Sequence, residues 1–231
     1  MQASFLIHDD MIDGSPMRRG KPSWGLLQQR EGHGLVGIND GLHMYMSVQQ
    51  LLMSSLTNPQ RSRCIEIIKL FGDCANATCL GQALDILGDI HFDLSDSNGV
   101  SQAKLPKTGQ DRLRDVTLDR FAAIARWKTS HYSFVLPVLA GMLLADVKNA
   151  TLFSNAKSIL LEIGEYFQAQ DDYLDVYGDA NVTGKAGTDI ADGKCSWNIA
   201  TALEKASADQ KNILNVSNNI FCLIFFPLSF I

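Results

Sequence analysis

Two copies of one acidic motif contain the residues best suited to chemistry in this sequence. Asp9 to Asp13 reads DDMID and Asp171 to Asp175 reads DDYLD, so both copies have the pattern D-D-x-x-D. In a helix, residues four positions apart lie on one face, which would place the first and last carboxylates of each motif side by side. Such carboxylates repel one another unless a cation lies between them, and Mg²⁺ prefers hard oxygen ligands of this kind. A solvated acidic face would explain one copy, but two copies in apolar surroundings indicate a metal site.

Basic residues follow both motifs closely. Arg18, Arg19 and Lys21 come soon after the first motif, and Lys185 and Lys194 come after the second, in segments that contain glycine. Metal-binding carboxylates flanked by cations are typical of a site for a polyphosphate. Ordinary surface charge would also explain the arginines, and a flexible loop would explain the Gly-Lys segments. The sequence contains no Walker A pattern, which argues against a nucleoside triphosphatase.

The elements that position these residues are predicted to be helices. Apolar residues recur at intervals of three and four over 42–56, 62–88, 118–145, 152–178 and 192–207, with an interruption near Pro137. No alternation of strands with helices is present, so the sequence predicts an all-α fold. The intervening segment 91–114 is polar and is typical of a surface loop.

Composition excludes several classes of protein. The chain has 231 residues, of which 46% are hydrophobic, so it is long and apolar enough to form a sizeable core. Its net charge of −5 argues against a nucleic-acid-binding protein. Its five cysteines lack C-x-x-C spacing, so we expect neither a disulfide framework nor a structural zinc site. We expect instead a reducing, cytoplasmic location. No apolar run is long enough to span a membrane.

The two ends of the sequence differ from the rest. Residues 220–231 carry no charge and no helical period, and we therefore divide the chain into a catalytic core over 1–211 and an atypical apolar tail over 212–231. The first acidic motif begins only nine residues into the chain, whereas a domain rarely opens with its active site. We therefore expect both ends to be incomplete relative to a longer parent protein.

Taken together, the motifs resemble the trans-isoprenyl diphosphate synthase family, above all its eukaryotic farnesyl-forming members. The likeness rests on five segments in the family's order, over residues 9–24, 81–85, 128–134, 167–175 and 184–197, and it covers about residues 2 to 210. One D-D-x-x-D motif alone would not be specific, but five linked segments are. The resemblance implies an isoprenoid-synthase-type helical bundle around a central apolar cavity, lacking some of the family's N- and C-terminal helices.

The resemblance also assigns roles near the metal. It implies Mg²⁺ as the cofactor, with three ligating carboxylates, Asp9, Asp13 and Asp171, and three supporting ones, Asp10, Asp172 and Asp175. Gln82 and Asp85 would support this metal-binding end.

Basic and amide side chains would bind the two implied substrates, an allylic diphosphate and isopentenyl diphosphate. The substrate-binding residues are Gln2, Arg18, Arg19, Lys128, Thr129, Gln168, Lys185 and Lys194. Arg19 and Gln2 would contact the isopentenyl diphosphate. Lys128, Thr129 and Gln168 are the implied catalytic residues, with Thr129 and Gln168 lining the reacting centre.

The implied activity is condensation of isopentenyl diphosphate with dimethylallyl or geranyl diphosphate, through Mg²⁺-assisted ionisation to an allylic carbocation. Two alternatives stay open, namely a terpene synthase on the same scaffold and a non-catalytic truncated isoform. Arg19 and Gln2 favour prenyl transfer, whereas the absence of the family's N-terminal Gly-Lys…Arg site favours a terpene synthase. Family members are commonly homodimers, and we expect the same of this chain.

Chain length of the product is expected to depend on the residues one helical turn before Asp9. Farnesyl-forming relatives usually have two aromatic residues at these positions, and here they are Phe5 and Ser4. Because Ser4 removes one aromatic ring, we expect a deeper pocket that allows a farnesyl or somewhat longer product. The variant Ser4→Phe tests this expectation.

Overall fold

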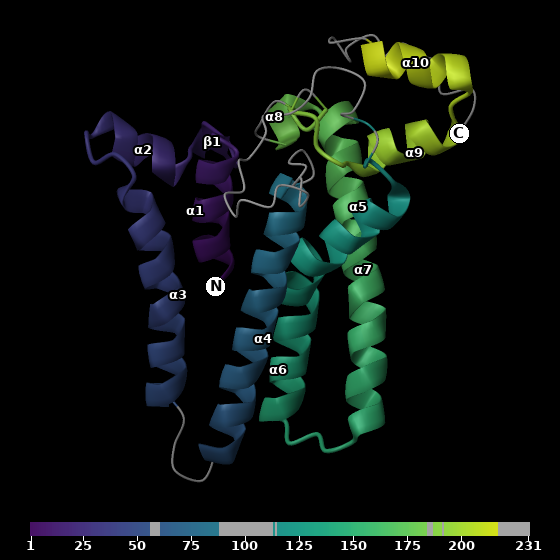
Figure 1. Cartoon of the computed structure of the whole chain (residues 1–231). Coiled ribbons are helices and arrows are strands. Elements are labelled where there is room, and N and C mark those ends of the chain that lie inside the picture. The colour runs from purple at the N-terminus through teal and green to yellow at the C-terminus, as the bar shows by residue number, and fades with distance from the viewer. Residues whose placement is uncertain (56–60, 88–112, 114, 184–186, 191, 217–231) are drawn as a thin grey trace, which may run out of the picture.

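The described part of the chain is helical apart from one short hairpin (Figure 1). The computed structural model describes residues 1–55, 61–87, 113, 115–183, 187–190 and 192–216. The elements are α1 (Gln2–Ile12), β1 (Met17–Arg18), β2 (Lys21–Pro22), α2 (Trp24–Arg30), α3 (Val36–Ser55), α4 (Arg61–Ile86), α5 (Leu118–Ile124), the π-helix η3 (Ala125–Val135), α6 (Leu136–Leu144), α7 (Ala150–Tyr177), α8 (Ala180–Thr183), α9 (Trp197–Lys205) and α10 (Ala208–Val216). The predicted all-α class is confirmed.

Side-chain caps explain where several helices begin. The hydroxyl oxygen of Ser23 accepts from the Leu26 N–H at the start of α2, and that of Thr117 accepts from the Arg120 N–H at the start of α5. The Asn149 side chain accepts from two N–H groups at the start of α7. Each cap satisfies N–H groups that have no partner inside the helix.

The predicted long helices are present, but the apolar periodicity did not reveal α1. The ranges 42–56, 62–88 and 152–178 correspond to α3, α4 and α7. The helix α1 has no clear apolar period because two of its buried residues, Ser4 and Asp10, are polar. The predicted loop lies almost wholly outside the described residues, as do residues 217–231 of the apolar tail.

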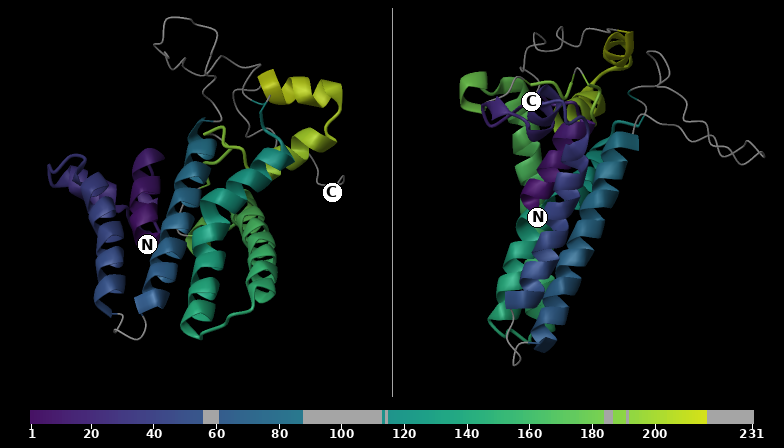
Figure 2. Two further views of the ribbon diagram at one scale, coloured as in Figure 1. Left: turned by 60° about the horizontal axis from the view of Figure 1, so that its bottom comes forward. Right: turned by 90° about the vertical axis from the view of Figure 1, so that its left-hand side faces the viewer.

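The helix α4, the continuous column of η3 and α6, and α7 lie side by side in the bundle, and α1 lies between α3 and α4 (Figures 1 and 2). The helices α4 and α7 both pack closely on η3. Two glycines allow this close approach. A Cβ atom at Gly81 of α4 would overlap the backbone nitrogen of Lys128, and one at Gly164 of α7 would overlap the side chain of Ser130.

The π-helix η3 replaces the interruption predicted near Pro137. Its eleven residues form wider turns than an α-helix, with hydrogen bonds that span five residues rather than four, and such segments are often found at functional sites. Pro137 is the second residue of α6, directly after this segment. Two residues predicted to be catalytic, Lys128 and Thr129, lie on η3.

The helix α1 presents different residues to its two sides. Toward α3, the Ser4 hydroxyl donates to the Gly41 carbonyl at 2.7 Å, and a ring nitrogen of His8 lies 3.0 Å from the Ile38 carbonyl. Toward η3, Phe5 and Asp9 contact residues of that helix. Ser4 and His8 therefore fix α1 to α3, Asp9 contacts the π-helix, and the Phe5 ring contacts both.

The carboxyl-terminal ends of α1, α4 and α7 lie at the same end of the bundle, the upper end in Figure 1. Both acidic motifs therefore lie at this end. Next to it, α5 and α9 pack together through a buried apolar cluster of Val116, Phe121, Ala125, Ile199 and Ala200. No helix in the described part of the chain is long and apolar enough to cross a membrane.

Candidate active site

The first acidic motif is surrounded by cations. Arg18 binds the buried carboxylate of Asp10 with two nitrogens, Nε at 3.0 Å and Nη2 at 2.5 Å, and Nη2 also lies 3.2 Å from Asp9. The Lys128 ammonium lies 3.1 Å from the other oxygen of Asp9. The Lys194 ammonium donates to Asp13 at 2.6 Å. Each of the three carboxylates therefore has a positively charged partner.

The two lysines join elements that are far apart in the sequence. Lys128 of η3 also donates to Asp85 of α4 at 2.5 Å, and Lys194 lies 3.4 Å from Asp189. Burial alone would lower the pKa of each lysine, but Asp85 and Asp9 raise the pKa of Lys128, and Asp189 and Asp13 raise the pKa of Lys194. Both ammonium groups consequently stay charged at neutral pH.

The first and last carboxylates of this motif respond differently to burial. Burial would raise the pKa of Asp9, but the charges of Lys128, Lys194 and Arg18 outweigh it and hold that pKa below its ordinary value. Burial raises the pKa of Asp13, and the Lys194 ammonium offsets only part of this effect. Asp9 is therefore the more strongly stabilised anion of the two.

The second acidic motif has a different environment. The buried Asp172 accepts a hydrogen bond from the Gln168 amide at 2.9 Å and another from the Trp197 N–H at 2.7 Å, and the Asn198 amide donates to the Asp172 carbonyl at 2.6 Å. Burial raises the pKa of Asp172 to about 7, although these hydrogen bonds oppose the shift. This carboxylate anchors the start of α9 to α7.

The outer residues of the second motif are more accessible. Asp171 is exposed, and Asp175 accepts the backbone N–H of Asp189 at 3.1 Å. Gly187 lies directly against the Asp175 carbonyl, where a Cβ atom would overlap the carbonyl oxygen. The loop after α7 therefore folds back onto the motif.

A hydrogen-bond chain links η3 to this motif. The Thr129 hydroxyl donates to the Gln168 side-chain oxygen at 2.8 Å, and the Gln168 amide donates in turn to Asp172. The three side chains hold one another in fixed orientations. The sequence predicted that Thr129 and Gln168 belong to one site, and the structure brings them into contact.

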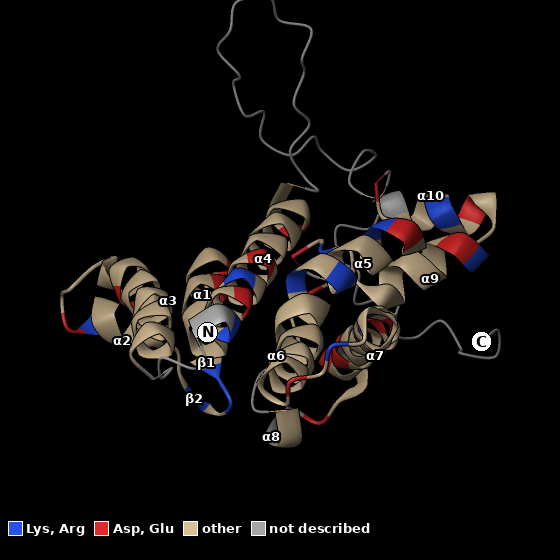
Figure 3. Ribbon diagram, turned by 90° about the horizontal axis from the view of Figure 1, so that it is seen from below, with Lys and Arg blue, Asp and Glu red and all other residues tan. Residues whose placement is uncertain are grey.

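The remaining predicted residues lie in varied positions. Arg19 is exposed at the tip of the hairpin β1–β2, in the left-handed region with φ of 52°, and Figure 3 shows the basic residues of this hairpin beside α1. Gln2 is exposed at the opposite end of α1 from Asp9. The Gln82 amide nitrogen is buried and has no hydrogen-bond partner among the described residues. Lys185 lies outside the described residues.

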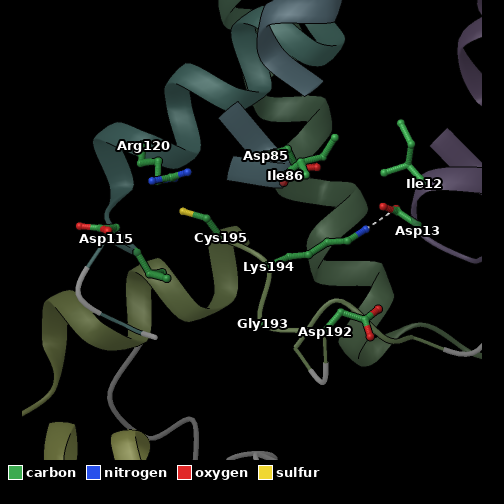
Figure 4. A pocket seen from close by; sticks show the side chains of 11 residues that line it. Ile12, Asp13, Asp85, Ile86, Asp115, Arg120, Asp192, Gly193, Lys194 and Cys195 are labelled. Carbon is green, nitrogen blue, oxygen red and sulfur yellow. Dashed lines mark hydrogen bonds and ion pairs between the residues drawn. The ribbon is translucent and has the colours of Figure 1, made fainter. Parts of the chain in front are cut away.

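A pocket of about 190 Å³ opens between α1, α4, α5 and the loop before α9 (Figure 4). Its lining is largely charged and includes Asp13, Asp85, Asp115, Arg120, Asp192 and Lys194. Cys195 also lines it, and burial raises the pKa of this thiol to about 11, so it stays protonated. The central apolar cavity implied by the resemblance stays a prediction.

The donor set at this end of the bundle is suited to Mg²⁺. Carboxylate oxygens of Asp9 and Asp85 lie within 3.1 Å of the Lys128 ammonium, and one of Asp13 lies 2.6 Å from the Lys194 ammonium, while the second motif lies on α7 at the same end of the bundle. Hard carboxylate oxygens are the ligands that Mg²⁺ takes, together with substrate phosphates. Within the described residues, three or more metal-ligating side chains are not yet gathered around one point. The lysine and arginine charges neutralise the carboxylates instead.

The two residues predicted to set chain length have different neighbours. Ser4 is 1% exposed and lies against α3. The Phe5 ring faces the rings of Tyr132 and Tyr45, with centroids 5.4 Å and 6.4 Å away. The role of both residues in product length stays a prediction.

Comparison with known proteins agrees with this geometry. A family model described as polyprenyl synthetase matches residues 1–219. The chain belongs to this family. It is 39% identical over 214 residues to the farnesyl pyrophosphate synthase of Bos taurus and 40% identical over 215 residues to that of Schizosaccharomyces pombe, covering 93% of this chain in both cases.

Solved structures of the family share the fold. A Trypanosoma brucei (T. brucei) farnesyl diphosphate synthase in complex with a bisphosphonate superimposes with a TM-score of 0.76 at 28% identity, over 93% of this chain and 69% of that one. The chain nevertheless spans only about half the length of the curated relatives it matches, 54% for the Bos taurus protein and 56% for the S. pombe protein.

Several partners in the site were missed by the sequence reasoning. Asp189 and the backbone N–H of Trp197 both lie within the segment 184–197, which was recognised as a motif. The motif indicated that this segment belongs to the site, but not which of its groups would make the contacts. A backbone N–H donor cannot be recognised from the residue type, because every residue except proline has one.

Proposed function

We propose that this chain is a prenyltransferase that condenses isopentenyl diphosphate with dimethylallyl or geranyl diphosphate, giving farnesyl diphosphate or a somewhat longer product. The observation that carries the proposal is the cluster in which Arg18, Lys128 and Lys194 contact the carboxylates of the first acidic motif. Cations and metal-binding carboxylates in one cluster suit a diphosphate, and membership of the polyprenyl synthetase family supports this substrate class.

We propose Mg²⁺ as the cofactor, held by Asp9, Asp13 and Asp171. The chemistry of the donor set supports this assignment, because these are carboxylates at the end of the bundle where the cations lie. When bound, Mg²⁺ supplies positive charge that neutralises the negative charge developing on the leaving diphosphate.

The chain's own residues would promote ionisation of the allylic substrate. Lys128, Lys194 and Arg18 are charged and already oriented by carboxylates, so they can bind diphosphate oxygens without large rearrangement. When the allylic C–O bond breaks, its electron pair leaves with the diphosphate. The Thr129 hydroxyl is buried and fixed by Gln168, so its oxygen can stabilise the carbocation.

The second substrate completes the reaction. The double bond of isopentenyl diphosphate attacks the carbocation, and a proton is then lost to the departed diphosphate. Arg19, at the tip of the basic hairpin, is the residue we propose to bind isopentenyl diphosphate, together with Gln2. Exclusion of water from the reacting centre prevents hydrolysis of the carbocation.

One incubation experiment separates this function from its alternatives. The purified chain is given Mg²⁺ and geranyl diphosphate, with and without isopentenyl diphosphate, and the products are identified by mass spectrometry. A longer prenyl diphosphate formed only with both substrates supports the proposal. A hydrocarbon or alcohol formed from geranyl diphosphate alone would indicate a terpene synthase, and no product from a folded chain would indicate a non-catalytic isoform. Chelation of Mg²⁺ should abolish any turnover.

A second copy of the chain is the protein partner we propose. Exposed apolar residues along α2–α3 support this, since Leu35, Ile38, Leu42, Leu51 and Met53 are each more than half exposed. Light scattering after size-exclusion chromatography measures the mass in solution, and a monomer at micromolar concentration would contradict the proposal. The cytoplasmic location stays a prediction from composition, and cell fractionation tests it.

A further inference from the structure

Two side chains of one helical column contact adjacent residues at the end of α4. The column begins with α5 and continues directly into η3. From α5, a terminal nitrogen (Nη2) of Arg120 donates to the Leu84 carbonyl at 2.6 Å. From η3, the Lys128 ammonium donates to the Asp85 carboxylate at 2.5 Å. The partners are 36 and 43 residues apart in the sequence, so the packing of this column against α4 brings them together.

The contact of Arg120 closes the carboxyl-terminal end of a long helix. The helix α4 ends at Ile86, and the last four carbonyls of an α-helix lack a donor one turn further along. The Leu84 carbonyl belongs to this group, and Arg120 supplies its donor from another helix. A cation at this end also complements the helix dipole. Arg120 therefore fixes the last turn of α4 against α5.

This contact affects the residue that follows Leu84. The Leu84 carbonyl and the Asp85 N–H belong to one planar peptide unit, so a bond that fixes the carbonyl also restricts the backbone that carries the Asp85 side chain. That side chain is only 11% exposed and binds the Lys128 ammonium, which in turn lies 3.1 Å from Asp9. A series of contacts therefore leads from Arg120 to a cation of the first acidic motif.

The turn that carries Arg120 is itself held in place. The Thr117 hydroxyl accepts the Arg120 backbone N–H at 3.1 Å, and the Thr117 carbonyl accepts from the Cys195 thiol, with its sulfur 3.7 Å away. Cys195 directly follows Lys194, and Arg120, Asp85 and Lys194 all line the pocket in Figure 4. The first turn of α5 thus contacts both α4 and the loop that carries the second lysine of the site.

We propose that Arg120 is a positioning residue, which holds the last turn of α4 so that Asp85 directs the Lys128 ammonium toward the diphosphate. This inference rests on the proposed function for the identity of the ligand. The Arg120 guanidinium donates to a backbone carbonyl, so its effect reaches the ligand through Lys128. Without Arg120 the ammonium would still be present, but its position would be less well defined, and poor placement of a binding group weakens its interaction.

The test is a double-mutant cycle in which the ligand is inorganic diphosphate. Calorimetry with Mg²⁺ measures its affinity for the wild type, Arg120→Met, Lys128→Met and the double variant. Arg120→Met should weaken binding roughly fivefold, and Lys128→Met roughly tenfold or more. The double variant should bind no more weakly than Lys128→Met, because no ammonium remains to be positioned. If Arg120 acted only through its own charge, the two losses would multiply.

Matched variants separate positioning from loss of charge or fold. Arg126→Met makes the same change in the same column, at an arginine whose Nε lies 2.7 Å from Glu165 of α7, and it should leave the affinity unchanged. Arg120→Lys should restore most of the affinity, because one bond to one carbonyl does not require the planar guanidinium. Arg120→Gln replaces Arg120→Met if circular dichroism shows that the methionine variant does not fold, and it should weaken binding likewise.

Three results would overturn the inference. They are an undiminished affinity in a folded Arg120→Met or Arg120→Gln variant, losses that multiply in the double variant, and a wild-type chain that does not bind diphosphate. A chain that shows the expected cycle in binding but forms no condensation product would contradict the proposed function and support this inference. The two proposals therefore fail in different ways.

Discussion

The two acidic motifs share one pattern, but their buried middle carboxylates meet different partners. Asp10 is bound by the guanidinium of Arg18, whereas Asp172 is bound by the uncharged N–H groups of Gln168 and Trp197. Both side chains are about 5% exposed, so burial is not the difference. The first motif is held by charge, and the second by hydrogen bonds that also fix α9.

This difference separates two roles within one motif. In each copy the middle residue is buried and holds structure, while the first and last residues are less buried. In the first copy the outer residues, Asp9 and Asp13, already contact lysines. In the second copy Asp171 is exposed. Cations are therefore concentrated around the first motif before any substrate binds.

The largest effect is expected from removing the lysine that joins the first motif to α4. Lys128→Met should lower the rate of condensation on the order of 100-fold or more, because an oriented charge next to the leaving group is lost. Lys148→Met makes the same change at a lysine whose side chain is 78% exposed and should leave the rate unchanged. Product formation measures both, and an active Lys128→Met variant would show that the first motif does not depend on its cations.

The glycine that brings α4 against the π-helix should be the next most sensitive position. Gly81→Ala should lower the free energy of unfolding by about 1–3 kcal/mol, since its Cβ atom would overlap the backbone of Lys128. Gly72→Ala, in the same helix with open space around it, should instead raise it by about 0.5–1 kcal/mol. Urea denaturation measures both changes, and equal effects at the two positions would contradict the close contact.

Neutralising the two middle carboxylates compares the motifs directly. Asp10→Asn should lower the free energy of unfolding by about 2 kcal/mol because hydrogen bonds to a charged partner are lost, and Asp172→Asn by only about 1 kcal/mol because its donors are neutral. Thermal or urea denaturation at neutral pH measures the two losses. A larger loss in the free energy of unfolding for Asp172→Asn than for Asp10→Asn would show that the charge of the partner does not distinguish the two motifs.

The smallest effect is expected at the hairpin that follows the first motif. Arg19→Gly should raise the free energy of unfolding by less than about 1 kcal/mol, because it relieves a positive φ, and it should weaken binding of isopentenyl diphosphate. Lys21→Gly removes a basic residue of the same hairpin whose φ is not positive and should not stabilise the fold. Opposite changes in stability and binding at Arg19 would show that the strain belongs to the binding site.

The sequence was most informative where partners are close along the chain or share a motif. Arg18 lies eight residues from Asp10, and its pairing follows from proximity. Lys194 and Asp13 are separated by 181 residues, and only the resemblance placed them in one site. The different partners of Asp10 and Asp172 could not be predicted, because identical patterns carry no information about which neighbouring element supplies the donors.

Packing also decided details that the residue types could not. The close contact of α1 with α3, in which the Ser4 hydroxyl donates to the Gly41 carbonyl, depends on glycine at position 41, because a Cβ atom there would overlap the ring of His8. The π-helix was seen in the sequence only as an interruption near Pro137. Its register is a property of how η3 fits between α4 and α7, which local propensity does not specify.

The π-helix also restricts how this family member can change during evolution. Deleting one residue within Ala125–Val135 would restore a narrower helix and rotate every later side chain of the column, including Phe134 and the whole of α6, away from its present neighbours. Substitutions in this segment alter one contact at a time, whereas a change in its length alters all contacts beyond it. The length of the segment is therefore constrained by all of these contacts at once, whereas each residue type is constrained only by its own contacts.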